Sequence, residues 1–139
     1  MKLTADLILH SSQYLNALNE FHIDLRGKVN ITVGYKIPYI ENLAATNDQF
    51  SCVDLTDNEI TSLSELPPLK RIRSLLLSNN RITRVDPTYG KCTPYLENLI
   101  LTNNKVIHSF RSTHLLKSRT LQNAAPLLDL ALLIIPSLK

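Results

Sequence analysis

Apolar residues recur along the middle of the chain in a pattern that appears three times. Residues 50–60, 72–82 and 96–106 each fit the template Leu-x-x-Leu-x-Leu-x-x-Asn-x-Ile, with other apolar side chains at some of the leucine positions. Apolar side chains that alternate with polar ones are typical of a short strand with one buried face. The pattern therefore predicts three short strands, each followed by a turn that contains an asparagine.

The asparagine in each turn has a structural reason. Tight turns leave backbone groups unpaired, and a side-chain amide directed into the core can donate to one such group and accept from another. The three asparagines are 22 and then 24 positions apart, and periods of about 20 to 29 residues are typical of leucine-rich repeats. The expected fold is an α/β leucine-rich-repeat solenoid with short parallel strands on its concave face and a helical or irregular convex side. The predicted structural residues are Asn58, Asn80 and Asn104.

An interrupted repeat precedes these three. A strand pattern around Leu25 is separated by residues 28–34 from the segment that should follow it directly. Leu25 and Leu55 are 30 positions apart, and removing the seven inserted residues restores a period of 23. Surface turns of solenoids tolerate such insertions. We therefore assign the repeats to residues 20–107, with an insertion at residues 28–34.

Both ends of the chain depart from the repeat. Thr4 is a favourable helix N-cap with Asp6 in the first turn, and an apolar face can follow it, formed by Leu7, Ile8, Tyr14, Leu15 and Leu18. We expect residues 1–19 to form an N-terminal cap helix that covers the open end of the first repeat. After His108 the template is lost. Residues 1–139 are thus predicted to form a single domain, in which residues 108–139 are a divergent tail with one partial repeat at residues 127–133.

The parity of the strand positions selects the concave face, because side chains alternate between the core and the outside. Adjacent outward Leu76 and Ile100 suggest a contact patch, and nearby acids would suit an amphipathic helix that carries basic residues. The alternative interpretation is that isolated surface aliphatics are ordinary. The candidate partner-binding residues are Asp24, Arg26, Asp54, Thr56, Leu76, Ser78, Ile100 and Thr102.

Charge adds a second set of candidates. The net charge is +3, which permits contact with nucleic acid but does not require it. Lys70, Arg71 and Arg73, together with Lys2, are candidates for contacts with RNA phosphates. Aromatic residues make up only 6% of the chain, so base stacking is not expected. A solvated basic surface is an equally good interpretation of these residues.

The sequence contains no recognisable catalytic or metal-binding constellation. Its four histidines lie in unrelated contexts, and its two cysteines, Cys52 and Cys92, lack metal-ligand spacing. With only three glycines, a glycine-rich phosphate loop is absent. The apolar stretch at residues 124–138 contains one acid and two prolines, so a spanning helix is not expected. We expect a non-catalytic protein with no cofactor, no metal, no small-molecule substrate and no membrane segment.

Several short segments are more specific than the repeat itself. They are Lys2-Leu-Thr-Ala-Asp-Leu-Ile8, Asp24-Leu-Arg-Gly27 continued by Tyr35-Lys-Ile-Pro38, Ile40-Glu-Asn-Leu43, Asp57-Asn-Glu-Ile60 and Leu99-Ile-Leu-Thr-Asn-Asn104. Together they resemble the A-prime family of U2 small nuclear ribonucleoprotein subunits. The resemblance covers residues 2 to about 107, with one break at residues 28–34. The chain looks like a C-terminally truncated or divergent member.

The resemblance implies a non-catalytic scaffold of the spliceosome that acts in pre-mRNA splicing in the nucleus. Members of this family hold an RNA-recognition-motif partner of the B-double-prime type and help it bind U2 small nuclear RNA. In such complexes the concave strand face grips a helix of the partner, and the RNA is reached through that partner. Two alternatives remain: a leucine-rich-repeat adaptor of another kind, phosphatase-regulatory or cytoskeletal, or a truncated product without function.

Overall fold

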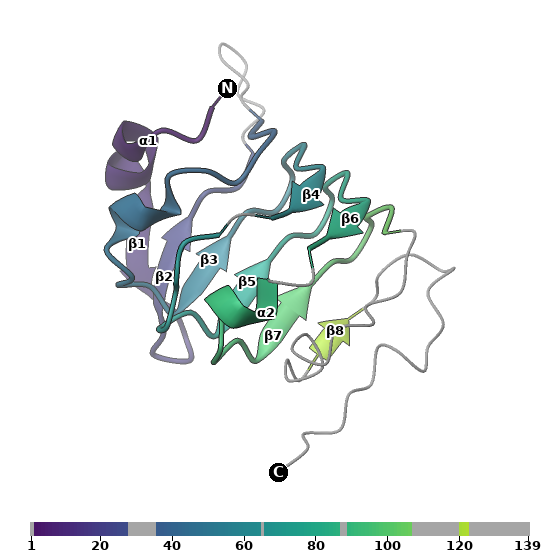
Figure 1. Ribbon diagram of the computed structural model, residues 1–139. Helices are drawn as coiled ribbons and strands as arrows, with labels where there is room; N and C mark the ends of the chain where they lie inside the picture. The colour runs from purple at the N-terminus through teal and green to yellow at the C-terminus, as the bar shows by residue number, and fades with distance from the viewer. Residues whose placement is uncertain (1, 28–35, 65, 87–88, 107–119, 123–139) are drawn as a thin grey trace.

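Strands from successive repeats lie side by side and build a curved sheet in the computed structural model (Figure 1). The structure describes residues 2–27, 36–64, 66–86, 89–106 and 120–122. The elements in chain order are α1 (Ala5–His10), β1 (Ser12–Leu15), β2 (Phe21–Asp24), the 3-10 helix η1 (Leu43–Thr46), β3 (Cys52–Asp54), β4 (Ser62–Leu63), β5 (Ser74–Leu76), β6 (Arg84–Val85), α2 (Tyr89–Cys92), β7 (Asn98–Ile100) and β8 (Thr120–Gln122).

The larger sheet has the strand order β1-β2-β3-β5-β7-β8. All neighbours in it are parallel except β1 and β2, which are antiparallel. On the opposite side of the solenoid, β4 and β6 form a two-stranded parallel sheet, and η1 and α2 are the helical turns (Figure 1). The predicted leucine-rich-repeat solenoid, with parallel strands on one side and mixed short elements on the other, is therefore confirmed.

The core consists of aliphatic side chains stacked in rows across the repeats. The central strand residues Ile23, Val53, Leu75 and Leu99 are register partners, and all of them are buried. The leucines two positions later form a second, fully buried row. That row is Leu25, Leu55, Leu77 and Leu101. Each repeat therefore buries its apolar face against its neighbours, and none has a core of its own.

A buried asparagine follows each strand and satisfies the backbone of the turn. The Oδ1 atom of Asn80 accepts a hydrogen bond from the Ile60 amide at 3.0 Å. Its Nδ2 atom donates to the carbonyl oxygens of Leu55 and Leu77 at 2.9 and 3.0 Å. Asn58 and Asn104 make the same three kinds of contact in their own repeats. Each amide thus joins its own repeat to the preceding one.

The N-terminal cap differs from the predicted helix over residues 1–19. The helix α1 begins after the N-cap Thr4 and ends at His10, where the Ser11 hydroxyl donates to the Leu7 carbonyl oxygen at 2.6 Å. The chain then forms a β-hairpin, because the Asn16 side chain accepts from the Leu18 and Glu20 amides and so fixes the turn between β1 and β2. The expected apolar helix face is therefore wrong beyond α1: Leu15 and Leu18 are 63% and 79% exposed.

The C-terminal part of the sheet contains a strand that the template did not reveal. β8 pairs with β7 in parallel, and Leu121 is the register partner of Leu99, 22 positions earlier. That separation is a normal repeat period, although residues 120–122 lack the leucine and asparagine pattern. The predicted partial repeat at residues 127–133 and the insertion at residues 28–34 lie outside the described residues.

We predict that Asn80→Ala lowers the free energy of unfolding by about 2 kcal/mol, because it leaves the buried Ile60 amide without its partner and removes one of the two amide donors from the carbonyl oxygens of Leu55 and Leu77. Denaturant unfolding followed by circular dichroism measures this change. The matched control is Asn79→Gly, since Asn79 is exposed and has a left-handed φ of 56° that glycine also adopts. Equal losses in the two variants would contradict a special role for the buried amide.

Candidate partner-binding face

Three rows of side chains run across the repeats on the concave face. The register of the strands places Asp24, Asp54, Leu76 and Ile100 in a middle row. A row at the strand starts contains His22, Cys52, Ser74 and Asn98. A third row lies just beyond the strand ends, where successive backbone hydrogen bonds align Arg26, Thr56, Ser78 and Thr102. All eight candidate partner-binding residues thus lie in two neighbouring rows of one face.

The first two repeats give this face an acidic end whose charges are already partly compensated. Asp24 and Asp54 are only 7% and 8% exposed. Asp24 accepts hydrogen bonds from the Arg26 amide and from its guanidinium, with Nη2 to Oδ2 at 2.8 Å. The hydrogen bond and the charge of Asp24 raise the pKa of Arg26, and Asp54 adds to this from 3.7 Å. Arg26 is therefore a fixed, exposed cation beside two carboxylates.

The next two repeats give the same row an apolar end. Leu76 and Ile100 are register partners on neighbouring strands, and both are partly exposed. Ser78 and Thr102 flank them at the strand ends and are also partly exposed. The middle row therefore changes from two carboxylates to two aliphatic side chains along the solenoid.

In the row at the strand starts, the two middle side chains, Cys52 and Ser74, are small and uncharged. Cys52 is buried, and burial, followed by the charges of Glu20 and Asp54, raises the pKa of its thiol to about 12. At neutral pH this thiol stays protonated and behaves as a small neutral side chain. Beside it, the Asn98 amide donates to the Ser74 hydroxyl at 3.2 Å. This row therefore offers shape and hydrogen bonds, but no reactive nucleophile.

An aromatic residue extends the face onto β1, and the sequence pattern did not place it there. Tyr14 is the register partner of His22, and their rings stack with centroids 4.7 Å apart. Beneath Tyr14, His22 is 7% exposed, and neither ring nitrogen has a hydrogen-bond partner among the described residues. The signal that identifies this strand is a hairpin pattern, two short alternating runs joined by a turn rich in asparagine.

The candidate RNA-contact residues fall on two elements. Lys70 and Arg71 are exposed in the loop that leads to β5, where their backbone amides donate to the Asp48 carboxylate. Arg73 follows in the same loop and forms an ion pair with Glu97 of the next repeat. Lys2 is exposed at the N-terminal cap, next to the buried Leu3. The structure therefore groups three of the four residues, one of them already paired with an acid.

Comparison with known proteins assigns the family. The profile of the family described as "Leucine-rich repeat" matches residues 1–134. The chain belongs to this family. It is 50% identical over 108 residues to the U2 small nuclear ribonucleoprotein A' of Arabidopsis thaliana, which covers 78% of this chain and 41% of that protein. It is 48% identical over 107 residues to the human protein of the same name, which covers 77% of this chain and 39% of the human protein.

A solved structure is similar to this leucine-rich-repeat protein over most of its length. The crystal structure of the Drosophila melanogaster SNF/U2A' complex contains a chain that is 44% identical to it, with a TM-score of 0.74. The match covers 84% of this chain and 63% of the Drosophila chain. The chain therefore resembles U2 small nuclear ribonucleoprotein A' proteins in both sequence and fold, but spans less than half the length of the plant and human relatives.

Within the described ranges, this leucine-rich-repeat protein has no helix that is long and apolar enough to cross a membrane. The same residues bring no three His, Cys, Asp or Glu side chains together in a way that would hold a metal ion. Both cysteines are free thiols. The outward rows of the concave face are the candidate functional site, because they bring the predicted partner-binding residues together.

The raised pKa of Cys52 predicts how stability depends on pH. Its folded-state pKa lies above the unfolded value, so its contribution is complete below the unfolded pKa of about 9 and is lost as the pH rises toward 12. Between about pH 8 and pH 10.5, the wild type should lose about 1–2 kcal/mol more than Cys52→Ala in free energy of unfolding. Urea unfolding of both proteins at each pH measures this. Parallel pH profiles would contradict the assigned burial of the thiol.

Proposed function

We propose that this chain is a non-catalytic scaffold of the spliceosome, whose concave face binds one helix of an RNA-recognition-motif protein of the B-double-prime type. Through that partner it supports binding to U2 small nuclear RNA in pre-mRNA splicing. The resemblance to A' proteins and the likeness to a chain solved in a complex with SNF support this assignment. A nuclear location follows from the same proposal.

The observation that carries the proposal is that the side chains along the middle row of the concave face change from acidic to aliphatic. Two partly exposed aliphatic side chains, Leu76 and Ile100, lie in line with two carboxylates, Asp24 and Asp54. A helix laid along this row would bury an apolar stripe at one end and present basic side chains to the other. Helix recognition in a groove needs this combination of an apolar anchor and a polar edge.

Contact with RNA is proposed to be secondary. Lys70 and Arg71 are exposed beside the start of β5 and are available for phosphate contacts, which add affinity without reading sequence. Arg73 would have to exchange its ion pair with Glu97 for such a contact. These side chains therefore fit a supporting role at the edge of an RNA that is held mainly by the partner.

The rival functions use the same fold. A phosphatase-regulatory or cytoskeletal adaptor would also present a concave face, and a truncated product without function would retain the repeats. The A'-like segments and relatives favour the spliceosomal proposal over the first rival. Direct binding distinguishes all three.

We predict that Leu76→Arg weakens binding to a purified RNA-recognition-motif partner of the B-double-prime type by about 30-fold or more. The substitution places a charge where an apolar side chain should be desolvated, and loss of such an anchor costs about 2 kcal/mol or more. Isothermal titration calorimetry, with and without a U2 stem-loop, measures the change.

The matched control is Leu9→Arg, because Leu9 is 63% exposed on α1, which lies outside the concave strands. This variant should bind like the wild type. If the wild type does not bind the partner, or if both variants lose affinity equally, the proposed function or the proposed surface is wrong.

A further inference from the structure

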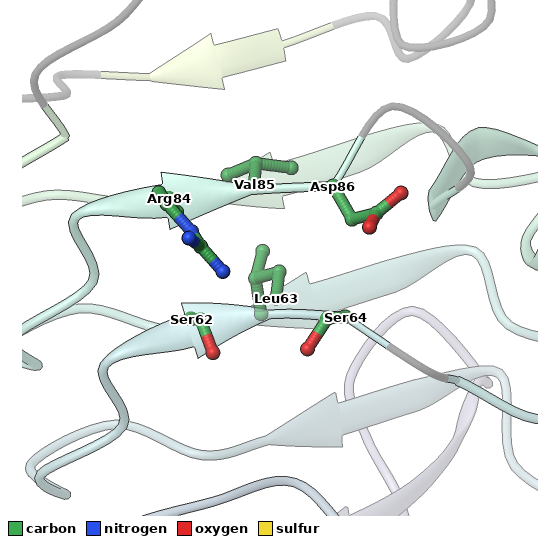
Figure 2. Close-up of a pocket in the computed structure, with 6 residues that line it drawn as sticks. All are labelled: Ser62, Leu63, Ser64, Arg84, Val85 and Asp86. Atoms are coloured by element: carbon green, nitrogen blue, oxygen red, sulfur yellow. The ribbon is translucent and has the colours of Figure 1, made fainter.

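On the convex side, Ser62 in β4 and Ser64 directly after β4 have opposite electrostatic surroundings. β4 and β6 pair in parallel, with Ser62 next to Arg84 and Leu63 next to Val85. Figure 2 shows the Arg84 side chain extending from β6 toward β4 at the Ser62 end, while Asp86 lies at the Ser64 end. The Asp86 amide donates to the Leu63 carbonyl oxygen at 2.8 Å, which keeps Asp86 beside Ser64.

Residues of the preceding repeat lie next to both serines. Residues 39–42 and the two serines line one surface pocket of about 340 Å³. The Glu59 and Arg81 amides donate to the carbonyl oxygens of Ile37 and Ile60, so residue 39 corresponds to residue 62, and residue 41 to residue 64. Ser62 is therefore paired with Arg84 and shares this pocket with Tyr39. Ser64 lies beside Asp86 and shares the pocket with Glu41.

The groups around Ser62 are free to receive an anion. Within the described ranges, the Ser62 hydroxyl takes part in no hydrogen bond, and Arg84 forms no ion pair. Arg84 is exposed and Ser62 is partly exposed. Tyr39 is 60% exposed, so its hydroxyl is accessible as a further donor. An unpaired guanidinium one strand away, at about 4.8 Å between backbones, is within ion-pair reach of a group attached to Ser62.

We propose that Ser62 is a phosphorylation site and that Arg84 of the following repeat holds its phosphate. A protein kinase with bound ATP supplies the group. The Ser62 oxygen forms a bond to the γ-phosphorus while the bond from that phosphorus to the β,γ-bridging oxygen breaks. ADP leaves, and the hydroxyl proton passes to the base of the kinase. Glu65, three residues after Ser62, provides the acidic position that acid-directed kinases recognise.

The charges around the two serines determine which of them can hold a phosphate. A phosphoserine carries a charge of about −1.5 to −2 at pH 7 and is stabilised opposite arginine but repelled beside carboxylates. At position 62 the phosphate forms charge-assisted hydrogen bonds with Arg84. At position 64 it lies beside the carboxylate of Asp86, with Glu41 in the same pocket. The site faces away from the concave rows, so this proposal does not depend on the proposed partner.

Two measurements on the full chain test the proposal. In the first, an acid-directed kinase and ATP label the wild type, Ser62→Ala and Ser64→Ala, and mass spectrometry locates the phosphate. We expect labelling of the wild type and of Ser64→Ala, with loss of the label in Ser62→Ala. An unlabelled wild type, or a label that Ser62→Ala retains and Ser64→Ala loses, would overturn the assignment.

In the second measurement, phosphoserine is incorporated genetically at position 62 or 64, and ³¹P NMR follows its titration. The second pKa of phosphoserine is about 6 in the absence of neighbours. Arginine should lower it at position 62, and the carboxylates should raise it at position 64. Arg84→Gln should raise the pKa at position 62 while leaving position 64 nearly unchanged. Identical pKa values at the two positions, or no response to Arg84→Gln, would show that Arg84 does not hold the phosphate.

Discussion

The buried asparagine in each turn is the interaction on which the rest of the solenoid depends. Asn80 bonds to the end of its own strand, to the end of the preceding strand and to the convex segment of the preceding repeat. One side chain therefore fixes three backbone segments: it is the partner of the Ile60 amide, and it shares the carbonyl oxygens of Leu55 and Leu77 with Asn58 and Asn104. Because the amides recur with the repeat, the strands stay in register from β2 to β7.

The same constraint holds the chain on both sides of residues 28–34, the segment that the sequence predicts to be an insertion. Asn58 donates to the Leu25 carbonyl oxygen and accepts from the Ile37 amide, so it holds the chain on both sides of residues 28–34. Gly27 lies against the second repeat so closely that a Cβ atom there would be 1.8 Å from the Asp57 carbonyl oxygen. The segment predicted to be an insertion begins just after this contact, and β2 and β3 are paired immediately before it.

Features that recur in every repeat could be predicted well from the sequence, whereas features that occur only once could not. Leucine rows, asparagines and outward positions follow from period and parity, because each recurs at a fixed phase. The sequence pattern did not predict the hairpin of β1, because the apolar residues there have a spacing that also fits a helix. The contacts that stabilise the hairpin, the Asn16 turn and the Tyr14–His22 stack, each occur once and so leave no repeated pattern. β8 escaped because tertiary pairing with β7 places it there, without the template residues. The alternation of inward and outward positions predicted that Asp24 and Asp54 point outward, but it could not predict that both are nearly buried.

That burial changes how the concave face would work with the proposed partner. Asp24 and Asp54 are already hydrogen-bonded to backbone amides, and Asp24 to a guanidinium, so a cation from a partner gains little after its own desolvation. Leu76 and Ile100 have no such compensation, and burying them yields about 25 cal/mol for each Å² removed from water. The aliphatic end would therefore supply most of the affinity. The acidic end would act mainly on orientation and association rate, as charges at a rim do.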